Sequence, residues 1–116
     1  MEIQSIYKSI VTNIINSIEV DLDWEQATLF VSREASNAIG FKGGTSLNDV
    51  RSSFKFRRFD TRQLVKDFHA LYEITTENES NDWNKADFIL FPSGKFSIDF
   101  KWDQEMADEL ESLAKE

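Results

Sequence analysis

The N-terminal segment shows the clearest helical pattern of hydrophobic and polar positions in the chain. Its apolar residues recur at the i, i+3, i+4, i+7 spacing that places them on one face of a helix. The members of this stripe are Ile3, Ile6, Tyr7, Ile10, Val11, Ile14, Ile15 and Ile18. Because many of them are β-branched and lower helix propensity, we expect this helix to depend on packing against the rest of the protein.

The next forty residues or so alternate between apolar stretches and turn signals. Residues 27–35 and 37–43 are short apolar stretches typical of strands. Two glycines and several polar residues over 43–49 predict a turn or a mobile loop. Over 53–59, phenylalanines alternate with basic residues, and this period of two predicts a third strand.

A second helix is expected from Asp60 to about Thr76. Asp60 is a candidate N-cap, and Gln63 lies where the partner of a capping box belongs. The buried stripe of this helix would consist of Leu64, Val65, Phe68, Leu71 and Tyr72.

The last third of the chain predicts a hairpin followed by a helix. A polar loop over 77–85 carries Trp83, and two alternating strands then flank the turn Pro92-Ser93-Gly94. In the second strand we expect Phe96, Ile98, Phe100 and Trp102 on the core side, opposite Ser97, Asp99, Lys101 and Asp103. Asp103 is a candidate cap for a final helix whose apolar residues are Met106, Ala107, Leu110, Leu113 and Ala114.

These elements predict an α+β fold in the order α-β-β-β-α-β-β-α. Short turns between consecutive strands favour an antiparallel sheet of about five strands with helices packed on one face. The chain has 116 residues, 41% of them hydrophobic, which fits a single domain over 1–116.

Composition narrows the setting in which the protein acts. The chain has no cysteine, which excludes disulfides, thiolate metal ligands and a thiol nucleophile. The N-terminus lacks the basic region and cleavage site of a signal peptide, and no run approaches the length of a membrane span. We therefore expect a cytoplasmic protein without a membrane partner.

The net charge of −8 arises entirely in the last two-fifths of the chain. Residues 1–72 carry nine acidic and nine basic side chains, whereas residues 73–116 carry twelve and four. An acidic surface repels phosphate backbones and speeds encounter with basic partners. Acidity of this size is also what keeps many small domains soluble, so charge alone does not choose between the two roles.

The sequence offers little that resembles a catalytic site. His69 is the only imidazole, and it lies beside the apolar stripe of the second helix without a triad motif around it. The glycines at 40, 43 and 44 match neither phosphate-binding motif, and no carboxylate cluster has the spacing of a metal loop. We therefore expect a protein that is not an enzyme and that uses no cofactor or metal.

A basic, aromatic stretch over 51–66 leaves a nucleic-acid surface open as an alternative. It combines six Lys and Arg residues with three phenylalanines, a composition found on such surfaces. The expected strand alternation turns the phenylalanines inward and leaves only a solvated basic face, and the whole domain is acidic. We therefore expect no nucleic-acid partner.

The segment NDWNKADFILFPSGKFSIDFKWDQE resembles the signature region of the YezG-like immunity proteins. The matching features are Trp83 in a polar loop, the strand 88–91, the turn Ser93-Gly94 and the strand 95–103, within a resemblance that covers about 68–110. The chain is shorter than typical members of that family. The resemblance implies a cytoplasmic antitoxin that binds the toxic C-terminal domain of a polymorphic secreted toxin, commonly a nuclease.

An immunity protein of this kind would cover the active site or substrate surface of its toxin. A nuclease presents a cationic cleft, which exposed carboxylates and an aromatic anchor are suited to meet. The candidate partner-binding residues are Asp99, Asp103, Glu105, Asp108, Glu109 and Glu111, together with Glu77, Glu79, Asp82 and Trp83 on the preceding loop. The alternative is a regulatory or scaffold module, in a monomer or a homo-oligomer, without a toxin partner.

Overall fold

The computed structural model describes residues 2–19, 21–35, 38–77 and 82–114. Its elements follow the order predicted from the sequence, and all strand pairs are antiparallel, so the α+β fold is confirmed. In chain order they are α1 (Ile3–Ser17), β1 (Gln26–Ala35), β2 (Ala38–Leu47), β3 (Val50–Ser53), a 3₁₀ turn (Phe56–Arg58), α2 (Thr61–Thr75), β4 (Lys85–Leu90), β5 (Phe96–Lys101) and α3 (Gln104–Ala114).

The five strands form one sheet in the order β3-β2-β1-β4-β5. The central strand β1 pairs with β2, its neighbour in sequence, and with β4 from the far end of the chain. Val31 marks both registers, since it lies opposite Phe41 on one side and Ala86 on the other. The sheet therefore joins the two halves of the chain through its central strand.

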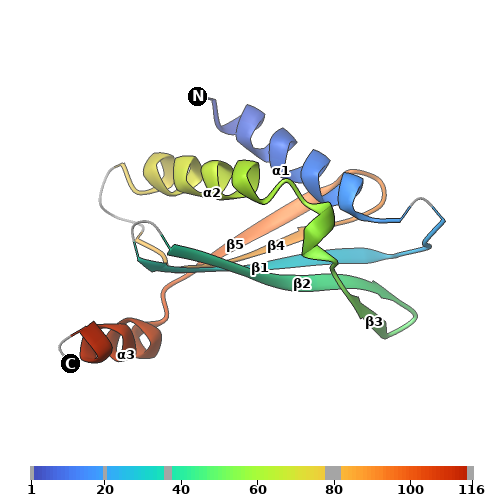
Figure 1. Ribbon diagram of the computed structural model, residues 1–116. Coiled ribbons are helices and arrows are strands. Elements are labelled where there is room, and N and C mark those ends of the chain that lie inside the picture. The colour runs from blue at the N-terminus through green and yellow to red at the C-terminus, as the bar shows by residue number, and fades with distance from the viewer. Residues whose placement is uncertain (1, 20, 36–37, 78–81, 115–116) are drawn as a thin grey trace.

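Helices α1 and α2 cover one face of this sheet (Figure 1). The predicted stripes supply the buried contacts, with Ile6, Ile10 and Ile14 from α1 and Leu64, Phe68 and Leu71 from α2 fully buried. Alternate residues of the two inner strands meet them, namely Ala27, Leu29 and Val31 of β1 and Ala86, Phe88 and Leu90 of β4. Burial of large apolar side chains at about 1.5–3 kcal/mol each provides the main stabilisation of this layer.

Polar contacts fix the start of α2 against α1. Asp60 caps α2 by accepting a hydrogen bond from the Gln63 backbone N–H at 3.1 Å, as predicted. The reciprocal half of the predicted capping box is absent. Gln63 donates to Asp67 at 2.9 Å, while the backbone N–H of Asp60 donates to Asn13 Oδ1 at 3.0 Å. A long-range contact has taken the place of the local one.

The third strand lies earlier than the alternation over 53–59 predicted. It is Val50–Ser53, and the following residues turn through the 3₁₀ segment. There the rings of Phe54, Phe56 and Phe59 pack on one another with centroids 5.0–5.9 Å apart. Spacing of two along a strand and clustering in a tight turn both bring alternate phenylalanines together, which is why the pattern was misleading.

The glycine-rich segment 43–49 is mostly strand rather than the turn or loop expected. β2 continues to Leu47, and the reversal is made by Asn48 and Asp49, whose φ angles are +51° and +67°. The backbone of Gly44 packs so closely on β3 that an added Cβ would lie 2.0 Å from the Ser52 carbonyl oxygen. The glycine there allows close backbone approach and does not make the turn.

The predicted C-terminal hairpin is present as β4 and β5. Gly94 makes its turn with a φ of +90°. Phe96 faces the helix-covered side, where its ring stacks on Phe88 and also contacts Tyr7, both with centroids 5.1 Å apart. Phe96 is nevertheless 37% exposed because β5 is an edge strand.

Helix α3 departs from the predicted packing. It lies on the opposite side of the sheet from α1 and α2 and projects from one end of the molecule (Figure 1). In its expected apolar stripe, Met106 and Leu110 are partly buried, whereas Leu113 is 60% exposed. The stripe therefore does not enter the main core. Among the described residues, no helix has the length and apolar character needed to cross a membrane.

Candidate protein-binding site

A pair of hydrogen bonds from Asn84 fixes the point where α3 begins. Asn84 Nδ2 donates to the carbonyl oxygen of Asp103 at 2.9 Å, and the backbone N–H of Asp103 donates to Asn84 Oδ1 at 2.7 Å. Asn84 is only 5% exposed and directly precedes β4, so this clamp ties the start of α3 to the beginning of that inner strand.

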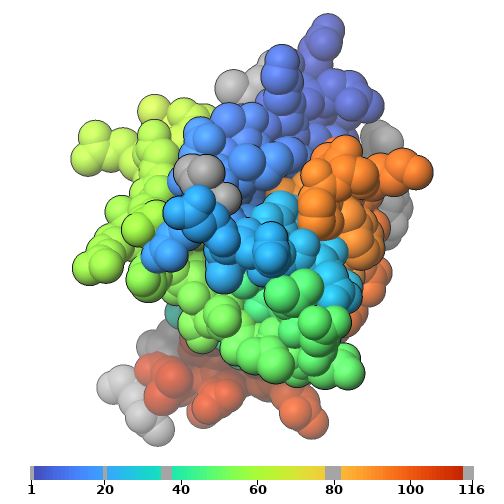
Figure 2. Space-filling model, turned by 90° about the vertical axis from the view of Figure 1, so that its right-hand side faces the viewer, coloured from blue at the N-terminus to red at the C-terminus, as the bar shows by residue number. Residues whose placement is uncertain are grey.

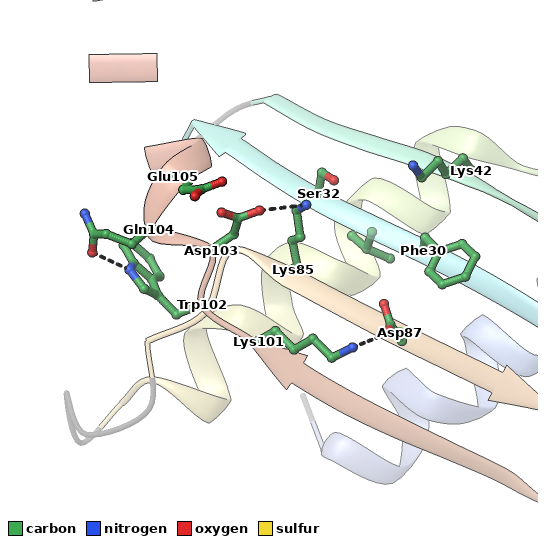
Figure 3. Close-up of a pocket in the computed structure, with 11 residues that line it drawn as sticks. Phe30, Ser32, Lys42, Lys85, Asp87, Lys101, Trp102, Asp103, Gln104 and Glu105 are labelled. Carbon is green, nitrogen blue, oxygen red and sulfur yellow. Dashed lines mark hydrogen bonds and ion pairs between the residues drawn. The ribbon is translucent and has the colours of Figure 1, made fainter. Parts of the chain in front are cut away.

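The side chain of Asp103 completes the attachment. Its Oδ1 accepts from the Met106 backbone N–H at 3.0 Å, which confirms the predicted N-cap, and its Oδ2 lies 2.9 Å from Lys85 Nζ (Figure 3). The hydrogen bond from Met106 and then Lys85 lower the pKa of Asp103. Asp103 therefore carries a charge already satisfied within the protein.

Helix α3 itself has two distinct sets of side chains. Its four carboxylates, all exposed, are Glu105, Asp108, Glu109 and Glu111, and no basic residue lies in its described last turn. Trp102, just before the helix, is 48% exposed and donates from Nε1 to Gln104 Oε1 at 2.8 Å (Figure 3). The helix thus presents an aromatic and aliphatic surface beside a strongly acidic one.

The uncovered face of the sheet is hollowed next to α3. A cavity of about 610 Å³ lies between the start of the helix and the strands, with Phe30 and Lys42 on its floor and Trp102 and Glu105 at its helix end (Figure 3). Lys101 crosses this face and pairs with Asp87 at 2.8 Å. A second hollow of about 500 Å³ follows toward β3 and shares Phe30, Lys42 and Asp87 with the first.

The structure brings only part of the predicted partner-binding set together. Glu105, Asp108, Glu109 and Glu111 share α3, and Asp103 anchors that helix. Asp99 is exposed on β5, with its carboxylate 3.8 Å from Lys101 Nζ. Glu77 is exposed just after α2, and Glu79 lies outside the described residues.

Two loop residues have roles inside the protein. The prediction that Trp83 is an interface anchor is wrong, because its side chain is only 2% exposed. Its ring packs on Tyr72 and Phe100, and its Nε1 donates a hydrogen bond to the Thr75 hydroxyl. A ring that fills the core is not available to a partner, so Trp83 leaves the candidate set. Asp82 remains exposed and accepts from the Tyr72 hydroxyl at 2.7 Å.

Sequence reasoning missed the basic and polar residues that shape this site. On the open face Lys85 pairs with Asp103 and Lys101 pairs with Asp87. Asn84 forms the clamp that holds the start of α3. The alternation over β4 and β5 contained the signal for the two lysines, since they fall on the polar side of the hairpin. The clamp joins the side chain of Asn84 to the main chain of Asp103, nineteen residues later, and no local sequence pattern predicts such a contact.

The basic stretch 51–66 does not form one surface. Lys55 and Arg58 both pair with Glu19, at 3.1 and 3.4 Å, whereas Arg51 lines the hollow on the open face of the sheet. Arg62 and Lys66 belong to α2, which covers the other face. This dispersion gives no continuous track for a phosphate backbone.

The described part of the chain was searched for clusters of side chains that could bind a metal ion. There, no group of three His, Asp or Glu side chains is arranged to hold a metal ion.

No protein-family model matches this chain, and a search of curated proteins found no match either. Membership of an immunity-protein family therefore stays a prediction that rests on the residues of the C-terminal half.

Proposed function

We propose that this protein binds and neutralises a basic protein partner, as an immunity protein does, with α3 as its recognition helix. The observation that supports this most directly is the combination found at α3. The helix is fixed at its start by Asn84 and Lys85, yet it lies apart from the main core with apolar and acidic side chains exposed.

The apolar residues of α3 have the spacing of a helix that docks in a groove. Met106, Leu110 and Leu113 stand at i, i+4 and i+7, the anchor positions of that recognition mode. Because the clamp already holds the helix in place, less conformational freedom is lost on binding than for a flexible segment. Trp102 adds an exposed aromatic ring, a residue type enriched among interface hot spots.

The acidic residues of α3 indicate the charge of the partner. Four exposed carboxylates on an eleven-residue helix create a negative potential. This potential attracts a cationic surface and speeds its association with α3. A nuclease cleft that holds phosphates is such a surface. With the resemblance of residues 68–110 to YezG-like immunity proteins, this leads us to propose the C-terminal domain of a polymorphic toxin as the partner, met in the cytoplasm.

The test is binding kinetics with the protein encoded by the neighbouring gene, which the proposal expects to be a toxin. The variant combines Glu105→Gln, Asp108→Asn and Glu109→Gln, and Asp103 is left intact because it caps α3. We expect association to slow by roughly tenfold at low salt and the difference from wild type to shrink as salt rises. A second variant, Leu110→Ala with Leu113→Ala, should instead speed dissociation.

The matched control neutralises exposed carboxylates elsewhere, with Glu34→Gln and Glu73→Gln. It should bind and protect cells like the wild type. If the α3 variants also bind and protect like the wild type at low salt, α3 is not the recognition helix. If the neighbouring gene encodes no toxin and no basic protein binds, the proposed function fails.

A further inference from the structure

The open face of the sheet has a second unmatched surface at the end away from α3. The hollow there is lined by the hydroxyl side chains of Thr28 and Ser53 and the bare backbone of Gly44, with Phe30 and Ile89 beside them. Its charged residues are Lys42, Arg51 and Asp87. Asp87 pairs with Lys101, whereas Lys42 and Arg51 have no ion-pair partner among the described residues. Phe30 is 37% exposed on the central strand.

This hollow and α3 complement each other. The hollow presents two unpaired cations around apolar side chains, whereas α3 presents carboxylates beside Leu110 and Leu113. The far end of the hollow, at Gln26, and the start of α3, beyond Ser32 and Lys85, lie at opposite ends of the strands. Phe30 and Lys42 lie between these ends and also line the cavity beside α3. Seen from the β2–β3 end, α3 protrudes below the sheet on the open side (Figure 2).

The clamp keeps α3 away from the Arg51 end of the hollow in its own chain. Only Trp102 and Asp103 separate β5 from α3, and Asp103 is held through its N–H, its carbonyl and its carboxylate. The helix is thereby kept at its own end of the face. A second copy, turned about a two-fold axis across the strands, brings its α3 to the opposite end.

We propose that two copies of this protein pair through their open sheet faces, each inserting α3 into the Lys42–Arg51 hollow of the other. Such a contact is self-complementary and closes with two copies. Glu105 and Glu109, one turn apart on the side of α3 next to Leu113, would meet Lys42 and Arg51, while Leu110 and Leu113 would cover Phe30 and Ile89. An α-helix is about 10 Å across, so the two helices would form one layer between the sheets.

This dimer does not depend on the proposed function, but it would affect how a toxin reaches α3. In the pair, α3 is covered by the second copy, so a toxin must displace that copy to reach the helix. Dilution of the protein, or a partner that binds more tightly, releases α3 by mass action. The dimer would then be the resting form and the monomer the form that binds.

Charge reversal in sedimentation experiments tests the pairing. One variant carries Lys42→Glu and Arg51→Glu, and the other carries Glu105→Lys and Glu109→Lys. At low salt we expect the wild type to dimerise and each variant alone to dimerise at least roughly tenfold more weakly. In an equimolar mixture both contacts regain opposite charges, so a heterodimer should form with an affinity close to that of the wild type.

Crosslinking provides a readout that does not depend on these variants folding. The chain has no cysteine, so Ser53→Cys and Ser112→Cys place the only two thiols, one beside the hollow and one on α3. A short bismaleimide should link two copies, whereas the control pair Ser5→Cys and Ser112→Cys, with Ser5 on α1, should not. The proposal is overturned if the wild type stays monomeric up to about 1 mM, if the mixture associates no better than its parts, or if both variants still dimerise.

Discussion

Replacement of Asn84 by alanine should release α3 while leaving the domain folded. The amide of Asn84 holds the backbone N–H and the carbonyl of Asp103 at 2.7 and 2.9 Å, and alanine removes both hydrogen bonds. The backbone hydrogen bond from the Asn84 N–H to Lys101 is retained, so the β4–β5 pairing should persist. The effect should therefore concentrate where α3 joins the sheet.

The expected magnitude follows from these two contacts. Each buried hydrogen bond contributes about 1 kcal/mol net, so local opening of α3 should become easier by about 2 kcal/mol. Since 1.4 kcal/mol corresponds to a factor of ten, amide exchange in α3 should accelerate about 30-fold. With only eleven residues, α3 is below the length at which an isolated helix is stable, so the freed helix should fray.

Hydrogen exchange followed by mass spectrometry separates α3 from the core. Peptides from α3 should exchange faster in Asn84→Ala, while peptides from α1 and β1 keep their protection. Tyr72→Phe is the control, because it removes one hydrogen bond, to Asp82, away from α3. Unchanged exchange in α3, or an equal loss of protection throughout the sheet, would refute the idea that Asn84 holds the helix.

Three further outcomes are expected. Gly44→Ala should lower the melting temperature far more than Gly40→Ala, because a Cβ at 44 meets the Ser52 carbonyl and one at 40 meets no atom within 4 Å. The pKa of Asp103 is lowered below 3.8 in the folded protein, so its stabilisation of α3 is present above that pH and is lost as pH falls through the lowered value. Helical circular dichroism should show this acid transition, and Asp103→Asn should flatten it. Finally, the purified protein should turn over no nuclease, protease or esterase substrate, and activity abolished by His69→Ala would contradict this.

Helix periodicity was the most informative signal in the sequence. The stripes of α1 and α2 predicted most of the residues buried against the sheet, because a period of 3.6 sustained over fifteen residues fits a helix and does not fit a strand. Ile15, at the edge of the α1 stripe, is the exception and is 44% exposed. The hairpin of β4 and β5 was equally clear, since alternation on both strands flanks a turn with Gly94. The short alternation over 53–59 was less informative, because the third strand lies at Val50–Ser53 instead.

The candidate site was less predictable than the fold. The carboxylates of α3 stand out in the sequence, but their exposure depends on where the helix lies, and amphipathic spacing alone favoured packing on the sheet. Trp83 shows the reverse case: a polar loop suggested a surface residue, whereas contacts with Tyr72 and Phe100 bury it. Both outcomes depend on tertiary neighbours that no local pattern encodes.

The separation of α3 from the core has a consequence for how this protein changes over evolution. Many mutations that harm a protein do so by disturbing buried packing, and none of the α3 side chains whose burial is described, residues 104–113, is fully buried. Substitutions along its exposed positions should therefore cost little stability, provided Asp103 and Asn84 are kept, and under the proposed function they would alter recognition. A lineage that must follow a rapidly diversifying adversary would gain from such an arrangement, because new specificities arise on one short segment while the rest of the domain remains unchanged.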